Sequence, residues 1–358
     1  MNMNLRPERS INKALISTTS RLVGEYETDG ALITHAWPDF GDRSTFMRFS
    51  EGPTSRSAFV FAFQTEDIPL TSPRIPDYSP TGDLICGYLA VLFGKRFDNH
   101  GLVEGGGLFH VPNLVEFGQL CSPSLPHNSH KPRVDFQIPL NLTEVRRIEP
   151  LLSSGSIDRK FLQTFQTCIK FYLQALQNAE RNPEVAYLHL ITTSEILSNF
   201  YDYDKDELLD AESKNALVAI ERDVTDGEAI ARFISGKLLQ VKKRFLTTLT
   251  NLVDESFFSR SESSQAIHSF KADSFMKCIS SAYDLRSRYI HTGVPFGSWT
   301  SLSVSGTNNE VQVGKPVIKD DNELGKLIGH APTFIGLERV VRYVLLRFAK
   351  QHGAYREY

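Results

Sequence analysis

The segment DRKFLQTFQTCIKFYLQAL, residues 158–176, repeats its apolar side chains at every third or fourth position. This spacing aligns them in one stripe along a helix of 3.6 residues per turn. From about Ser156 onward proline and glycine become scarce and the same pattern returns. It predicts helices over residues 187–200, 238–252, 270–291 and 334–348, a less regular one over 211–233, and a joining loop over 293–321. The second half is therefore predicted to be an all-α bundle.

The first 150 residues have a different pattern. Four short segments, residues 30–37, 44–49, 57–63 and 133–140, are rich in β-branched or aromatic residues and end at Gly, Pro, Asp or Ser. They predict strands of a small sheet. Residues 83–97 predict one buried helix, and proline-rich loops are expected over 69–80 and 123–132. The expected class is α+β, with a strand-rich mixed domain over residues 1–150 and the helical bundle over 151–358; 358 residues suffice for two domains.

Charge excludes a general nucleic-acid binder. The net charge is −3, with 14 basic and 17 acidic residues before position 151 and 25 of each after it. A contact with nucleic acid must then be local. Basic residues cluster at 242–244 and along Arg339, Arg342, Arg347 and Lys350. We expect these clusters to be solvated helix faces, with phosphate contacts as the alternative.

Four widely spaced cysteines without a CxxC pair signal neither a disulfide framework nor a zinc ribbon. No apolar run approaches the roughly 20 residues that span a bilayer, and the first residues lack a signal peptide. A cytoplasmic protein without membrane contact is expected. Cys121, His127 and His130 lack a fourth ligand at useful spacing, and residues 202–213 fail the calcium-loop pattern, so neither metal nor cofactor is predicted.

The segment AYDLRSRYIHTG, residues 282–293, carries the most distinctive chemistry. Arg286 lies on the apolar stripe of its predicted helix, although a guanidinium is costly to bury unless it is paired. We expect it to face a carboxylate, an anion or a polar cleft. His291 lies in the last helical turn, where the helix dipole favours an imidazolium. Arg288, three residues before His291, is the competing cation.

Arg286 followed by four residues and His291 resembles the Arg-x(4–6)-His motif of HEPN domains. The wording LRSRYIHTG is similar to the ApeA-like branch, and the resemblance covers about the last 200 residues. It implies a metal-independent ribonuclease in which His291 acts as acid or base and Arg286 binds the scissile phosphate. It also implies a homodimer, with the motifs of two protomers lining one cleft.

Three further residues are assigned supporting roles. Ser287 replaces the Asn, Asp or His that the family most often has after the arginine, which weakens or removes one polar contact with substrate. Tyr289 either stacks on a base or packs in the core. Glu195 either orients Arg286 or is a boundary carboxylate, and an ion pair of Arg286 with Glu195 alone would need no catalytic role.

The first functional hypothesis is thus an endoribonuclease cleaving RNA, tRNA included, through 2′-OH attack. The family suggests bacterial antiphage defence by abortive infection, or a toxin system. The strand-rich domain would then sense a trigger or partner protein. The alternative is a non-catalytic HEPN module that binds RNA, nucleotide or a protein partner, and a third reading is a helical regulatory protein with a fortuitous motif.

Overall fold

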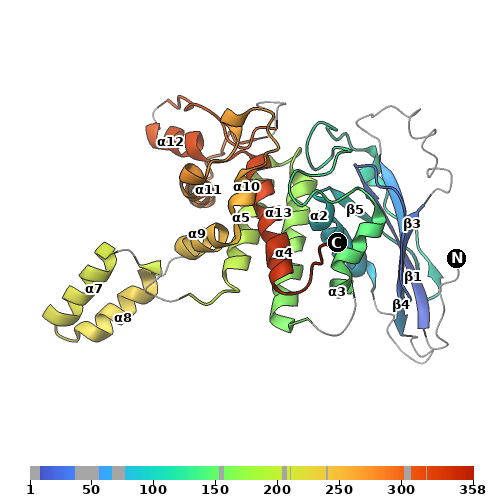
Figure 1. Cartoon of the computed structure of the whole chain (residues 1–358), viewed down its shortest axis with the longest axis horizontal. Coiled ribbons are helices and arrows are strands. Elements are labelled where there is room, and N and C mark those ends of the chain that lie inside the picture. Colours follow the sequence, from blue (N-terminus) through green and yellow to red (C-terminus); the bar gives the residue numbers. More distant parts are fainter. Residues whose placement is uncertain are drawn as a thin grey trace.

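The computed structural model describes residues 9–36, 56–66, 77–152, 157–203, 208–209, 211–238, 241–301, 308–319 and 321–358. The fold is mixed α and β, with an antiparallel sheet at one end and most of the helices at the other (Figure 1). The predicted coarse class, α+β, is confirmed. None of the helices in the described part is both long and apolar enough to cross a membrane.

The sheet has six strands in the order β2-β3-β4-β1-β5-β6, and every neighbouring pair is antiparallel. The strands are β1 (Arg9–Thr18), β2 (Tyr26–Glu27), β3 (Ala31–His35), β4 (Ser57–Glu66), β5 (Phe97–Gly105) and β6 (Leu108–Phe109). Side chains alternate between the two faces of a strand. Phe59, Phe61 and Phe63 of β4 therefore share one face, and all three are buried in the main hydrophobic core.

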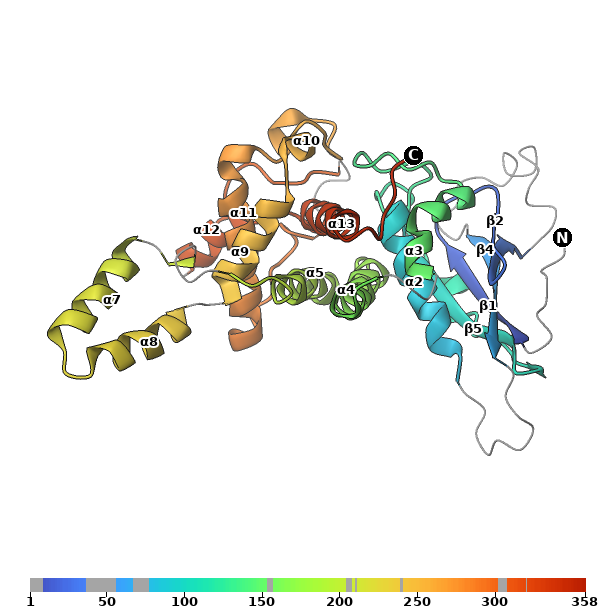
Figure 2. The same cartoon turned by 60° about the horizontal axis from the view of Figure 1, so that its bottom comes forward.

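Helix α2 (Ser79–Phe93) covers this face of the sheet, beside the short helix α3 (Glu149–Leu152) (Figure 2). It ends at Gly94, which adopts the left-handed conformation with φ 63°. A Cβ atom there would lie 2.6 Å from side-chain atoms of Arg133 and Arg342. Glycine is therefore required both by the positive φ and by the lack of space for a side chain. Arg342 donates to the carbonyl oxygens of Val91 at 2.9 Å and Leu92 at 2.6 Å, which satisfies carbonyl groups at the buried C-terminal end of α2.

Five longer helices pack against one another beyond α2: α4 (Arg159–Asn178), α5 (Pro183–Ser198), α9 (Val241–Leu252), α11 (Ala272–Thr292) and α13 (Phe334–Gln351). The side chain of Asp158 caps α4 by accepting from the Phe161 amide at 2.7 Å. Two short helices flank the group, α10 (Glu255–Phe258) and α12 (Asn322–His330). Helices α7 (Ala211–Asp223) and α8 (Gly227–Leu238) form a hairpin that projects from the body (Figures 1 and 2).

Helix α2 contacts both the sheet and α4, so one hydrophobic core runs through both parts of the molecule. Tyr88 of α2 stacks on Phe165 of α4 with ring centroids 6.3 Å apart. The boundary expected between residues 150 and 151 falls within α3. A division into two separately folding domains stays a prediction.

The basic cluster on α13 corrects one expectation. Arg339 and Arg342 are 1% and 2% exposed, so this half of the cluster is buried, whereas Arg347 is partly exposed and Lys350 is exposed. Arg339 forms an ion pair with Asp135 at 2.7 Å and another with Glu310 at 2.7 Å. Glu338 beside them holds Arg133 at 2.6 Å. These long-range pairs anchor the segment around residue 135 to α13.

Several predicted elements differ from the observed ones. The strand predicted over 133–140 is wrong: Phe136 and Gln137 have positive φ, and the flanking charged side chains are committed to α13. The helix predicted over 83–97 begins at Ser79 and ends at Phe93, with Pro80 in its first turn instead of in a loop. Residues 211–233, predicted as one helix, are divided between α7 and α8. The strand predicted over 44–49 lies outside the described residues.

Candidate functional site

The predicted motif lies in the last two turns of α11, as the sequence indicated. The helix ends at Gly293, whose φ is 71° and whose amide donates to the carbonyl oxygen of Tyr289 at 2.8 Å. This is the glycine C-cap predicted for that position. His291 is exposed in the final turn. Its imidazole is therefore presented to solvent by a well-defined helix end.

Arg286 faces α5, where it forms the ion pair considered in the sequence analysis. Its Nη2 atom lies 3.1 Å from Oε2 of Glu195, with side chains 25% and 12% exposed. The guanidinium carbon also lies 5.8 Å from the ring centroid of Tyr283. Burial, and then the nearby Glu195 carboxylate, raise the pKa of Tyr283. Arg286 thus keeps a fixed orientation, and its buried Nε has no hydrogen-bond partner among the residues described.

His291 instead lines a shallow pocket of about 430 Å³ between α11 and α12. Ser287 and Arg288 line the pocket with it, at the i−4 and i−3 positions of the same helical face. Arg286 is five residues away from His291, or about 140° around the helix axis. The described structure therefore brings Arg288 and Ser287 to the histidine, and it directs Arg286 toward the neighbouring face.

Carboxylates as well as basic side chains lie at this pocket. Asp284 and Glu323 line it. Arg288 forms an ion pair with Asp321, which also caps α12 by accepting from the Leu324 amide at 2.9 Å. Lys242, from the basic cluster of α9, lies 2.6 Å from Asp284. In a single chain the pocket has no clear excess of positive charge.

Tyr289 packs toward the interior. Its ring lies 5.2 Å from that of Phe296, and it is half-buried against the main core. This contact agrees with the packing role considered for it, and base stacking has no geometric support here.

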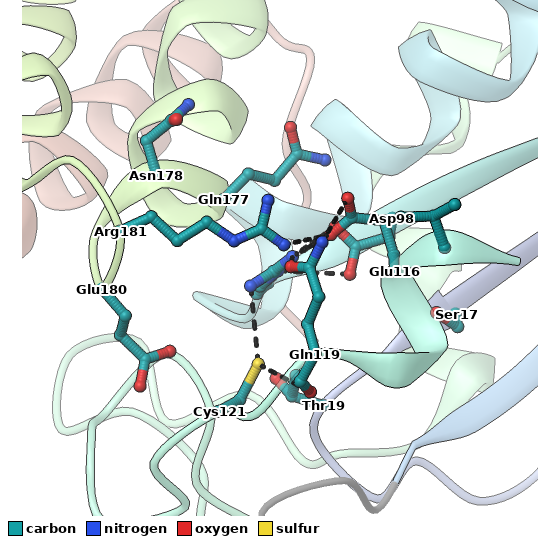
Figure 3. A network of polar contacts seen from close by, with 12 residues as sticks. Ser17, Thr19, Asp98, Glu116, Gln119, Cys121, Gln177, Asn178, Glu180 and Arg181 are labelled. Carbon is teal, nitrogen blue, oxygen red and sulfur yellow. Dashed lines mark hydrogen bonds and ion pairs between the residues drawn. The ribbon is translucent and has the colours of Figure 1, made fainter.

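A second polar network, far from the motif in sequence, was missed by the sequence analysis (Figure 3). It centres on Arg96, which contacts Asp98 at 3.1 Å, Glu116 at 2.7 Å and the Cys121 sulfur at 3.4 Å. Arg181 joins it through Glu116 at 3.3 Å. Burial raises the pKa of the Cys121 thiol, although Arg96 opposes the effect. The alternation of charge in Arg96-Phe97-Asp98 was the only local signal.

The residues considered as metal ligands, Cys121, His127 and His130, do not form a metal site. His127 is buried with its ring edge toward Phe334, 5.9 Å between centroids, whereas Cys121 belongs to the Arg96 network. Among the described residues, no group of three or more His, Cys, Asp or Glu side chains is arranged to hold a metal ion.

Comparison with known proteins adds no relative: no family model matches the chain, and no curated protein or solved structure does so at a significant level.

Proposed function

We propose that this chain is a metal-independent endoribonuclease of the HEPN type, active as a homodimer. One observation carries the proposal: an exposed histidine ends α11, with Ser287 and Arg288 lining its pocket and Arg286 on the adjacent face. An imidazole for proton transfer, with the Arg288 guanidinium in the same pocket and Arg286 on the adjacent face, supplies the kinds of group that RNA cleavage through the 2′-OH needs.

The reaction forms a bond between O2′ and phosphorus and breaks the bond between phosphorus and O5′. A base takes the 2′-OH proton and an acid protonates the leaving O5′, which gives a 2′,3′-cyclic phosphate and a 5′-OH end. His291 performs one of these transfers, and His291 of a second copy performs the other. A guanidinium, of Arg286 or Arg288, stabilises the charge that develops on the phosphorane oxygens.

The ion pairs of Arg286 and Arg288 limit what a dimer can add to the site. Arg286 is paired with Glu195, and Arg288 with Asp321, so neither guanidinium of a lone chain is free of a carboxylate. Packing two α11 ends together brings guanidiniums and their carboxylate partners in equal number, so the dimer adds the second His291 and no net positive charge. Sedimentation of the purified protein checks this step, and a monomer at the concentration of the cleavage assay contradicts it.

The same ion pairs favour the runner-up function, a non-catalytic module that binds RNA, nucleotide or a protein. An Arg286 that is paired with Glu195 has a structural role even without catalysis. The two functions differ in their products, because only the nuclease generates cyclic phosphate ends.

The test compares wild type with His291→Ala, Arg286→Ala and Arg288→Ala on tRNA and total RNA in EDTA. Loss of general acid-base catalysis lowers cleavage by about 100-fold or more in His291→Ala. The matched control is His330→Ala, which removes the histidine from the last turn of the neighbouring helix α12. Equal cleavage by wild type and His291→Ala, or cleavage only with a divalent metal, refutes the proposal. The two arginine variants decide which guanidinium acts on the phosphate.

A further inference from the structure

A cavity of about 920 Å³ lies at the opposite end of the molecule from the α11 site. Its walls come from the sheet (β1 to β4), from α2 and from α3. This is the size of pocket that holds a small organic molecule. None of the motif residues lines this cavity.

The inner wall is apolar and aromatic. Phe61 and Phe63 of β4 stack on each other with centroids 5.1 Å apart, and Leu84 and Tyr88 of α2 face them across the cavity. Phe61, Phe63 and Tyr88 are 5%, 7% and 2% exposed, so only their edges reach the cavity, beside the partly buried Leu84. An apolar or aromatic ligand body buried there gains hydrophobic free energy in proportion to its covered area.

The rim is acidic. Glu27, Asp29 and Glu149 line the cavity, against the single guanidinium of Arg9. In the part of the chain that the structure describes, Glu27 and Asp29 have no ion pair. Glu149 has a distant one, at 3.5 Å to the half-exposed Arg356. Exposed pairs of this kind contribute little, so the rim retains its negative charge.

Tyr26 also lines the cavity, next to Glu27 in the chain. It is 3% exposed, and burial together with the Glu149 carboxylate raises the pKa of its hydroxyl to about 12, against the opposing effects of a Thr28 hydrogen bond and the Arg146 guanidinium. A neutral, electron-rich ring thus lies beside a carboxylate, the pair of groups that attracts an ammonium ion by cation–π and charge attraction. The same charges repel an anion, so this cavity does not fit RNA or a nucleotide.

We propose that this cavity binds a small organic cation: an aromatic or aliphatic body against Phe61, Phe63 and Tyr88, with its ammonium group near Tyr26 and Glu149. The site goes beyond the proposed nuclease function and does not depend on it. It also touches the helices, because the Tyr88 hydroxyl accepts from Gln166 of α4 at 3.1 Å. A bound cation therefore contacts a residue that packs directly on the helical part.

The test uses three probes with the same indole body: tryptamine as cation, 3-ethylindole as neutral analogue and indole-3-propionate as anion. Isothermal titration calorimetry of the full chain at low salt measures each dissociation constant. We expect tryptamine to bind with a Kd of about 1 mM or tighter. The neutral analogue binds about fivefold or more weakly, the anion shows no binding, and added salt weakens tryptamine binding.

Variants locate the binding. Glu149→Gln and the double variant Glu27→Gln/Asp29→Asn each weaken tryptamine about fivefold and leave 3-ethylindole unchanged. Ala31→Phe, on β3, fills the cavity and removes binding of both. The matched control is Glu25→Gln, which removes an exposed carboxylate of the same strand region that does not line the cavity.

Three results overturn the proposal: no heat from tryptamine up to about 5 mM, equal affinity for all three charges, or unchanged tryptamine binding in the carboxylate variants. If Ala31→Phe fails to fold, the carboxylate variants decide alone, because they alter only surface charge. Binding is measured without RNA, so it succeeds or fails independently of the cleavage experiment.

Discussion

Glu338 offers the sharpest test of how the segment around residue 135 is anchored to the helices. It is 1% exposed and accepts from both terminal nitrogens of Arg133, at 2.9 and 2.6 Å, while the Tyr172 hydroxyl also donates to it. Glu338→Gln removes the charge but preserves the shape. Breaking a buried pair costs about 3–5 kcal/mol. Because Glu262 still contacts Arg133 at 2.5 Å, we expect a loss of about 3 kcal/mol, at the lower end of that range.

Urea unfolding followed by circular dichroism measures this loss. With an m-value of about 3 kcal/mol/M, the midpoint falls by about 1 M. The matched control is Glu228→Gln, which breaks a helical ion pair whose side chains are 69% and 80% exposed and should change stability by less than about 0.5 kcal/mol. A loss below about 1 kcal/mol in Glu338→Gln refutes the reasoning, because Arg133 would then not depend on that carboxylate.

The pH dependence has a defined sign. Burial alone raises the pKa of Glu338, but the Arg133 guanidinium outweighs it and holds the pKa below its ordinary value of 4.5. The carboxylate therefore contributes stability at pH values above 4.5, and this contribution disappears as the pH falls through the lowered pKa. The difference between wild type and Glu338→Gln should be constant near neutral pH and should shrink on acidification below 4.5. A difference that grows on acidification contradicts the assignment.

Two further predictions concern helix contacts. Gly87→Ala places a Cβ atom 3.1 Å from the buried side chain of Ile169, so we expect a net loss of about 1 kcal/mol in the free energy of unfolding, measured in urea. Adding Ile169→Val should restore part of this loss, and a gain in stability in Gly87→Ala would contradict the close packing of α2 on α4. Glu195→Gln should cost less than about 1 kcal/mol of stability but lower the kcat of RNA cleavage about tenfold with little change in KM, because Arg286 loses the partner that orients it. Glu195→Asp should restore part of the kcat. An unchanged kcat means that the ion pair of Arg286 with Glu195 is only structural.

The helices were predictable because their signal is local. The stripe of residues 158–176 and the glycine at position 293 fix α4 and the end of α11 within a few neighbouring residues. Strand β1 escaped prediction because its sequence, RSINKALIST, alternates poorly between apolar and polar. It is held instead by two neighbours distant in the chain, β4 and β5.

The errors involve partners far apart in sequence. Arg339 and Arg342 looked like surface residues because nothing near them in the chain announces Asp135 or the carbonyls at the end of α2. At the motif, helical spacing correctly placed Arg288 and His291 on one face, and the apolar stripe correctly suggested a carboxylate for Arg286. The α12 wall of the pocket was missed, although Asp321 at the N-cap and the helical spacing of Leu324, Leu327 and Ile328 were local signals for it.

The central proposal is that His291 takes part in RNA cleavage in which the 2′-OH of the RNA attacks the neighbouring phosphate. The most direct measurement is end-group analysis of a defined RNA incubated with wild type in EDTA, beside the same RNA carrying one 2′-deoxy nucleotide at the cleaved position. The account predicts 2′,3′-cyclic phosphate and 5′-OH ends from the ribose substrate, no cut at the deoxy position, and neither product with His291→Ala. Cleavage of the deoxy substrate, 5′-phosphate ends, or full activity of His291→Ala would contradict it.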